Sequence, residues 1–200
     1  MKKSERLFNI CVGISVLSWA LFGIIADIER FCITPVRISV ALINLFVGFI
    51  FFIRKPLIRQ GTISSIILSL PSFLASGFAY KIVQPTNIWP KYAELLFIIG
   101  AFFTIVSFVY LGRCFAVFPS VRGVVTTGPY RIVRHPAYLG ELIMILACLL
   151  AKPGLVCLPF IMGVTGIAIR IIFEEKVMLE HITYKKYTEA VNWRLLPGIW

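Results

Sequence analysis

Composition and charge exclude an ordinary soluble domain. The chain has 200 residues, of which 59% are hydrophobic and 14% charged, and its net charge is +11. Soluble domains are about 45–50% apolar and about 25% charged, and so few charges cannot cover a surface that faces water. A strongly basic soluble protein would indicate nucleic acid, but no basic helix stands clear of the apolar runs. The composition therefore predicts an all-α integral membrane protein that lies in a lipid bilayer and has no nucleic-acid partner.

Six apolar stretches predict membrane helices, in chain order about 7–28, 36–53, 63–80, 92–111, 138–151 and 155–173. The first follows a basic start that resembles a signal peptide, but no small-residue cleavage site follows it, so we expect a retained helix. Pro71 predicts a kink in the third. The fifth is short for the roughly 20 residues that a span needs, so we expect five or six complete spans. Lys152, Pro153 and Gly154 predict a tight turn that joins the last two stretches in a helical hairpin.

The basic residues predict which way the chain crosses the membrane. With the N-terminus in the cytoplasm and six alternating spans, 15 Lys and Arg residues fall on the cytoplasmic side and five on the other. This distribution satisfies the positive-inside rule. Both termini are then expected in the cytoplasm. A chain this compact is typical of a microbial protein, so we expect it in the cytoplasmic membrane, or in the endoplasmic reticulum membrane if the source is eukaryotic.

The residues after Phe173 mix charged and apolar side chains. Their spacing predicts an amphipathic helix that lies near the membrane interface, and Pro197 and Gly198 are expected to end it. The five cysteines form no CxxC pair, and the chain has no HExxH and no paired His/Cys spacing. The sequence therefore predicts no metal site.

The densest polar cluster is TTGPYRIVRHPAYLGE, residues 126–141, between two apolar stretches. His135 precedes a proline and should avoid helical geometry, so we expect it at the entrance of the fifth helix. The free N–H groups of a helix start suit an anion or a carboxylate, and Arg134 adds positive charge. The alternative is an ordinary positively charged loop with tyrosines at the interface.

A second cluster is the acidic pair Glu174 and Glu175, at the end of the last apolar stretch. Neighbours on a helix point about 100° apart, so one side chain can point inward while the other meets solvent. Either carboxylate can hold a ligand's ammonium group, or simply pair with Arg170. The late Arg194 can return to the site, unless this segment is an interfacial anchor built on its tryptophans.

Four motifs in this order resemble the isoprenylcysteine carboxyl methyltransferase family and the wider group that includes phospholipid methyltransferases. They are LGR (111–113), the cluster at 126–141, EE (174–175) and RLLPGIW (194–200). The resemblance covers the chain from Leu111 onward, and the first three spans carry no signature. We accordingly divide the chain into N-terminal transmembrane helices, 1–91, and a methyltransferase core, 92–200.

The resemblance implies a membrane enzyme that transfers a methyl group from S-adenosyl-L-methionine to a lipophilic acceptor at the cytoplasmic face. The implied acceptor is the carboxylate of an isoprenylcysteine-like compound, which needs no general base, whereas an amine would arrive protonated and need one. The cofactor-binding residues expected here are Tyr130, Arg134, His135, Pro136, Tyr138, Gly140, Glu174 and Glu175. Arg194, which would orient the acceptor, and Glu175 are the expected catalytic residues.

Two other functions compete with this interpretation. Membrane sterol and steroid reductases have a similar RHPNYxGE motif and use NADPH, but this chain has Ala137 where they usually have Asn. The GPYRIVRHP stretch and the PGIW ending look more like the methyltransferases. The third function is a non-catalytic, lipid-binding membrane protein with the same fold, although intact motifs argue against it.

Overall fold

The computed structural model describes residues 2–84 and 89–200, so the predicted N-terminal part, 1–91, includes five residues outside the described ranges. The helices are α1 (Lys3–Glu29), α2 (Pro35–Ile53), α3 (Ile63–Val83), α4 (Lys91–Leu111), α5 (Pro136–Ala151), α6 (Pro153–Met178) and α7 (Ile182–Ala190). The short elements between them are β1 (Arg59–Gln60), η2 (Gly112–Cys114), β2 (Ser120–Val121) and η3 (Gly128–Arg131).

Five of the described helices, α1 to α4 and α6, are long and apolar enough to cross a membrane. With 16 residues, α5 is about 24 Å long, which is short of the bilayer's hydrocarbon core of about 30 Å. The chain is thus an all-α membrane protein, and the prediction of six apolar helices with a short fifth is confirmed. Lys152 alone separates α5 from α6, as the predicted helical hairpin requires.

Local sequence explains where several helices begin. The hydroxyl oxygens of Thr34 and Thr62 accept hydrogen bonds from the first-turn N–H groups of α2 and α3, as N-cap residues do. Pro35 occupies the first position of α2, where its missing N–H costs no helical hydrogen bond. His135 has the non-helical φ of −128° that the following proline predicts.

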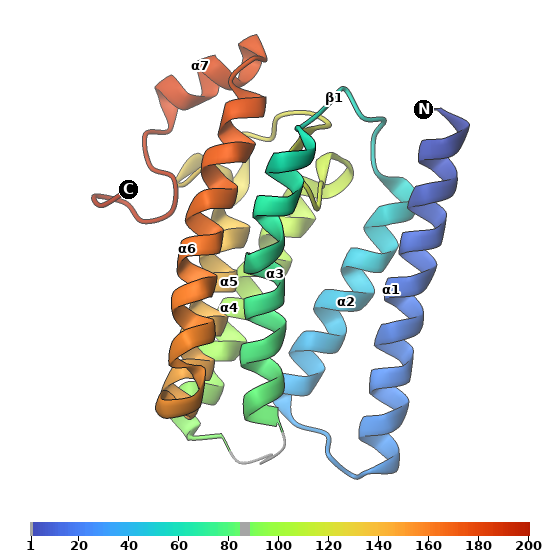
Figure 1. Cartoon of the computed structure of the whole chain (residues 1–200), viewed down its shortest axis with the longest axis vertical. Coiled ribbons are helices and arrows are strands. Elements are labelled where there is room, and N and C mark those ends of the chain that lie inside the picture. The colour runs from blue at the N-terminus through green and yellow to red at the C-terminus, as the bar shows by residue number, and fades with distance from the viewer. Residues whose placement is uncertain (1, 85–88) are drawn as a thin grey trace.

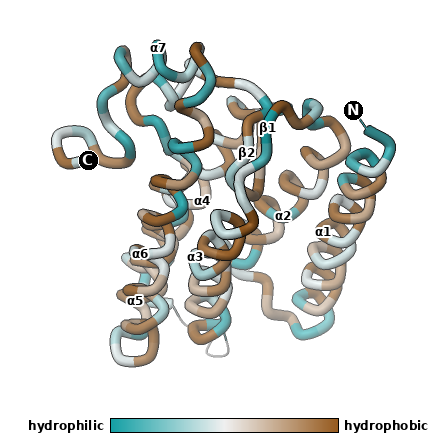
Figure 2. The backbone as a smooth tube through the Cα atoms, turned by 45° about the horizontal axis from the view of Figure 1, so that its top comes forward, coloured by the Kyte–Doolittle hydropathy of each residue, from teal (hydrophilic) through white to brown (hydrophobic). Residues whose placement is uncertain are grey.

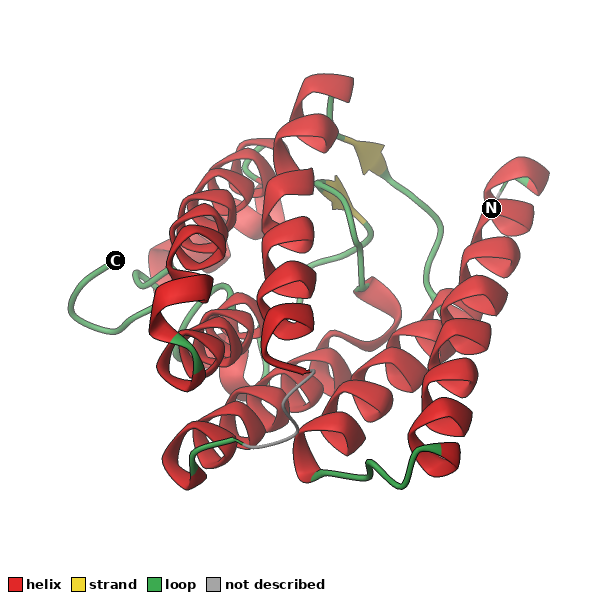
Figure 3. Ribbon diagram, turned by 60° about the horizontal axis from the view of Figure 1, so that its bottom comes forward, coloured by secondary structure: helices red, strands yellow, loops and turns green. Residues whose placement is uncertain are grey.

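The helices form two groups (Figures 1 and 3). Helices α1 and α2 pack on each other as a hairpin, while α3, α4, α5 and α6 form a bundle in which α4 packs on α5 and α3 on α6. The contact between α2 and α4 joins the two groups. The antiparallel pair β1–β2 links the α2–α3 connection to the α4–α5 connection.

One end of the molecule gathers the polar segments. The N-terminus, β1 and α7 lie there (Figure 1), and hydrophilic colour is concentrated at this end while the helix shafts are mainly hydrophobic (Figure 2). We call it the polar end. Along the shafts, large apolar side chains such as Trp19, Phe22 and Leu74 are exposed, as expected where lipid is the solvent.

The C-terminal region differs from the sequence prediction. Helix α6 continues to Met178, so the acidic pair lies inside it, and the next helix ends at Ala190 instead of at Pro197. Beyond it, the N–H of Arg194 donates to the carbonyl of Trp200 over 2.9 Å. These residues leave the helix because their backbone groups find partners outside it.

Candidate active site

Two backbone hydrogen bonds bring the C-terminal segment to the start of α5. The N–H of Arg134 donates to the carbonyl of Trp193, and the N–H of His135 donates to that of Arg194, each over 2.9 Å. Helix α6 ends beside the same region, so the polar cluster, the acidic pair and the C-terminal segment meet at the polar end. Sequence spacing alone does not reveal this meeting, since the partners are far apart along the chain.

Glu175 lies at the centre of this meeting and is 3% exposed. Its Oε2 accepts a hydrogen bond of 2.8 Å from Nε of Arg194. Its Oε1 lies 3.2 Å from Nε2 of His135 and 3.2 Å from Nε of Arg134. The Arg134 contact is a charge contact without hydrogen-bond alignment, because that Nε has no hydrogen-bond partner among the described residues. A buried carboxylate surrounded in this way holds basic side chains from two segments together.

Glu174 has a different environment. Its Oε2 accepts a short hydrogen bond from the hydroxyl of Tyr138, whose ring stacks on that of His135 at 5.5 Å with an angle of 18° between the planes. The guanidinium of Arg170 lies 4.7 Å from the centre of the Tyr138 ring. The two acids therefore face different neighbours, as helical geometry predicts: Glu175 is buried and Glu174 is only partly buried.

A large cleft adjoins Glu174. Its volume is about 1530 Å³, and its lining includes Arg134, His135, Tyr138 and Glu174 at the site just described. Glu175 and Arg194 are not among its lining residues. The cleft continues between the two helix groups, where apolar side chains of α1 and α2 face those of α4. Its lining includes Val12, Val16, Ile43, Val47 and Phe108.

Three tyrosines outside the membrane helices support the site. The hydroxyl of Tyr187 donates to the carbonyl of Tyr130 over 2.6 Å, and the hydroxyl of Tyr184 lies 3.5 Å from Oε1 of Glu175. Burial is the main cause that raises the pKa of all three phenols, and carboxylates nearby add to it. The three side chains therefore stay protonated at neutral pH and act as neutral hydrogen-bond donors.

Gly140 and Pro136 lie outside the cleft lining. A Cβ added to Gly140 would lie 2.3 Å from Oγ1 of Thr104 and 2.7 Å from the carbonyl oxygen of Gly100. The glycine thus lets α5 approach α4 closely, as small residues do between membrane helices. Pro136 is buried at the first position of α5. The structure explains both residues by the position of α5, and their expected contact with a cofactor stays a prediction.

The sequence does not by itself identify one polar group in the cleft, the carboxylate of Glu141. Oε1 of Glu141 accepts a hydrogen bond of 2.6 Å from the hydroxyl of Ser76, and both residues line the cleft together with Arg170. Nη2 of Arg170 also donates to the carbonyl of Val117 over 2.6 Å. The available signal was an ionisable residue inside an apolar stretch, which in a membrane helix usually marks a functional site.

Within residues 2–84 and 89–200, no group of three or more His, Cys, Asp and Glu side chains is placed to hold a metal ion.

Comparison with known proteins adds one finding. A family model described as phospholipid methyltransferase matches residues 90–186, which run from the start of α4 into α7 and include the polar cluster and the acidic pair. Comparison with curated proteins and with solved structures gives no significant match. Residues 90–186, just under half of the chain, thus match the phospholipid methyltransferase family, which is part of the wider isoprenylcysteine and phospholipid methyltransferase group, and this match indicates a membrane methyltransferase.

Proposed function

We propose that this protein transfers a methyl group from S-adenosyl-L-methionine to a lipophilic acceptor at the polar end, which we take to face the cytoplasm. The observation that carries the proposal is the cleft. The family-motif residues Arg134, His135 and Glu174 line one part of it, and its other walls are apolar side chains of membrane helices. A soluble methyl donor and a membrane-soluble acceptor can therefore meet without either one crossing into the other's phase.

The charges of the site fit the proposed cofactor. S-adenosylmethionine carries a carboxylate, an ammonium group and ribose hydroxyls, and its sulfonium supplies an activated methyl group when it is bound. Arg134 and His135 suit the carboxylate, since hydrogen bonds to charged groups are the strong ones. Glu174 suits the ammonium or the ribose hydroxyls, and Tyr138 holds its carboxylate in place. In this proposal Tyr130 is a wall of the site.

Glu175 and Arg194 take a different part in the proposal. Glu175 is a positioning residue, because its carboxylate fixes Arg134, His135 and Arg194 relative to one another. The side chain of Arg194 is 36% exposed and binds Glu175 through Nε. Because Arg194 lies outside the cleft lining, it acts here through Glu175, and its expected contact with an acceptor stays a prediction. Methyl transfer is an in-line displacement, so the protein contributes orientation and exclusion of water more than a nucleophile.

A carboxylate acceptor is the first candidate. Six Lys and Arg side chains and three carboxylates are among the described residues that line the cleft, and this excess of positive charge attracts an anionic acceptor. A carboxylate of an isoprenylcysteine-like compound meets this requirement and brings an apolar chain that suits the apolar walls.

An amine acceptor is the second candidate, and one observation favours it. The carboxylate of Glu141 lies in the cleft, where it can take the proton that an ammonium group must lose before it attacks a methyl group. In this case, replacing Glu141 by Gln removes the proton acceptor and stops turnover. With a carboxylate acceptor the same change leaves turnover largely intact.

The test uses S-adenosylmethionine labelled in its methyl group and the purified protein in vesicles of total lipid. We expect label in the organic phase, lost in the Glu174→Gln variant and retained in Arg6→Gln, an exposed control on α1 outside the cleft lining. Alkaline hydrolysis then separates the candidates, because a methyl ester releases volatile methanol and an N-methyl group does not. Absence of label from the organic phase, in the presence of bound cofactor, would contradict a lipophilic acceptor.

A further inference from the structure

A second polar cluster lies at the polar end, where α1 and α2 meet the segment after β2. Oε1 of Glu5 lies 2.8 Å from Nη1 of Arg122, and Oδ1 of Asn9 accepts a hydrogen bond of 2.9 Å from Nε of Arg54. Residues four apart share one face of a helix, so α1 holds the two arginines side by side. Nη1 of Arg122 also donates to the carbonyl of Lys55, the residue after Arg54.

The positive charge of this cluster exceeds the negative charge. Arg54 is 7% exposed and Arg122 is 5% exposed, and among the described residues Glu5 is the only carboxylate that forms a salt bridge or hydrogen bond with either of them. The pKa of Arg54 is lowered to about 10, mainly by burial and also by the nearby Arg122, while Glu5 acts in the opposite direction. Two buried guanidiniums with one carboxylate leave a charge that an anion can neutralise.

A structural role alone does not explain the charges and hydrogen-bond donors of this cluster. The two arginines do connect α1, α2 and the segment after β2, and a buried charge in such a connection needs its hydrogen-bond partners. However, Nε of Arg122 is buried and has no hydrogen-bond partner among the described residues. Asn9, which binds Arg54, contributes no charge. The cluster therefore has an N–H donor with no acceptor among the described residues, as well as a net positive charge.

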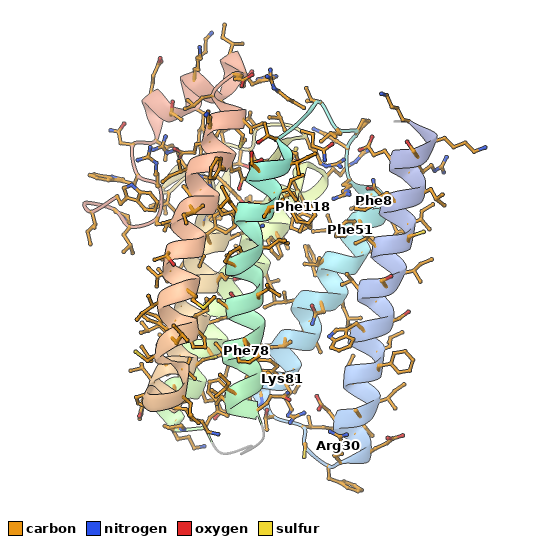
Figure 4. The ribbon with its side chains drawn as sticks, viewed as in Figure 1. Phe8, Arg30, Phe51, Phe78, Lys81 and Phe118 are labelled. Atoms are coloured by element: carbon orange, nitrogen blue, oxygen red, sulfur yellow. The ribbon has the colours of Figure 1, made fainter. Side chains whose placement is uncertain are left out.

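The cluster borders an apolar wall of the cleft. Arg54 and Arg122 both line the cleft, as do Phe8, Phe51 and Phe118. Figure 4 shows these three phenylalanines at the polar end, on α1, α2 and the segment before β2, whereas Arg30 and Lys81 lie at the opposite end. The guanidinium of Arg54 lies 4.1 Å from the centre of the Phe51 ring. A ligand that fits here has an anionic group joined to an apolar chain.

We propose that Arg54 and Arg122 bind the phosphate of an anionic phospholipid whose acyl chain lies in the cleft against Phe8 and Phe51. Phosphate oxygens are preferred partners of guanidinium groups, and the polar end is at the level where lipid headgroups lie. The net positive charge of the cluster favours an anionic headgroup over a zwitterionic one, whose own cation it repels. This site does not depend on the methyl-transfer proposal, since none of its residues belongs to the four family motifs at 111–113, 126–141, 174–175 and 194–200.

The test measures lipid binding to the purified protein in detergent, with dioleoyl phosphatidylglycerol, dioleoyl phosphatidylcholine and inorganic phosphate as separate probes in calorimetry. We expect phosphatidylglycerol to bind about tenfold more tightly than phosphatidylcholine, since the two share the phosphate and repulsion of the choline cation by the net positive charge of the cluster is worth about that factor. Arg54→Gln and Arg122→Gln should each remove this preference, whereas the exposed control Arg6→Gln should retain it. Binding of S-adenosylhomocysteine should be unchanged in all three variants.

A variant that is expected to strengthen lipid binding gives a result that misfolding cannot explain. Glu5→Gln removes the only carboxylate that Arg122 is seen to bind within the described residues but keeps an oxygen that accepts hydrogen bonds, so it should bind phosphatidylglycerol more tightly than the native chain. A folding defect would not tighten binding. Equal binding of the two lipids, the same loss in Arg6→Gln, or binding of inorganic phosphate as tight as that of the lipid would each overturn the proposal.

Discussion

At the scale of single residues, one step along α6 separates two acids with different tasks. Glu174 lines the cleft and accepts from Tyr138, whereas Glu175 is enclosed by Arg134, His135 and Arg194. The sequence indicates that the two side chains point in different directions but cannot tell which one meets a ligand. That depends on the C-terminal segment, which brings Arg194 to Glu175.

Glu175→Gln should act mainly on stability. The change removes the negative charge that the largely buried Arg134 and the partly exposed Arg194 contact, and removing one partner of a buried ion pair costs on the order of 3 kcal/mol. Thermal unfolding in detergent should show a lower midpoint than that of the native chain. An unchanged midpoint together with lost cofactor affinity would make Glu175 a direct cofactor ligand.

Glu174→Gln should act mainly on binding. Its carboxylate is proposed to hold the cofactor's ammonium or ribose, and a hydrogen bond to a charged group contributes about 1.5–3 kcal/mol. Calorimetry with S-adenosylhomocysteine should show an affinity at least about tenfold lower, while the unfolding midpoint changes little. Native affinity in this variant would remove Glu174 from the cofactor site.

At the scale of elements, the sequence predicts the membrane helices well and their contacts poorly. Apolar periodicity and length place all six helices, and His135 before a proline locates the start of α5. The prediction that the C-terminal helix ends at Pro197 is wrong, because the backbone hydrogen bonds that join residues 134–135 to residues 193–194 outweigh the local helix signals. Long-range pairing of this kind leaves no periodic pattern in the chain.

The contact between α4 and α5 gives a prediction at this scale. Gly140→Ala should separate the two helices, because its new Cβ would meet Thr104 and Gly100, and overpacking costs about 1–3 kcal/mol. The unfolding midpoint should fall and turnover with it. Gly77→Ala in α3 is the matched control, since no atom of the described residues lies within 4 Å of its added Cβ. Equal effects of the two changes would contradict a packing role for Gly140.

The C-terminal segment gives a second prediction for an element. Ending the chain at Leu196 removes the Trp200 carbonyl, which accepts from the N–H groups of residues 194–196. Arg194 should then lose its fixed approach to Glu175, and cofactor affinity should fall at least about tenfold. Calorimetry measures this loss, and the full-length Ile199→Ala variant, whose exposed side chain is replaced while the Trp200 carbonyl remains, serves as the control. Native affinity in the shortened chain would exclude the segment from the site.

At the scale of the whole molecule, the tyrosines of the polar end predict its response to alkali. Burial raises the pKa of Tyr130, Tyr184 and Tyr187 above the ordinary value of 10.0. Above about pH 10 the unfolded chain releases these protons and the folded chain keeps them, so the free energy of unfolding falls as pH rises. Tyr187→Phe should reduce this slope in pH-dependent unfolding. A slope unchanged by the substitution would place the alkaline sensitivity elsewhere.

The arrangement of the helices explains which residues of the site can be identified from the sequence alone. Motif residues such as His135 and Glu174 are found because their resemblance to a family lies in local stretches. Arg54, Arg122 and Glu141 are not found, because the first two become neighbours only when α1, α2 and the segment after β2 come together, and the third faces the cleft only when α5 is placed against its neighbours. The division of the chain between residues 91 and 92 stays a prediction, and the family match begins close to it, at residue 90.

The most direct measurement is calorimetric titration of the purified protein with S-adenosylhomocysteine and, separately, with NADPH. We predict micromolar binding of S-adenosylhomocysteine, no binding of NADPH, and loss of the first in His135→Ala, because His135 joins Tyr138 and Glu175 at the cleft. The Arg6→Gln control should bind as the native chain does. Binding of NADPH without binding of S-adenosylhomocysteine would contradict the methyl-transfer proposal and favour a reductase.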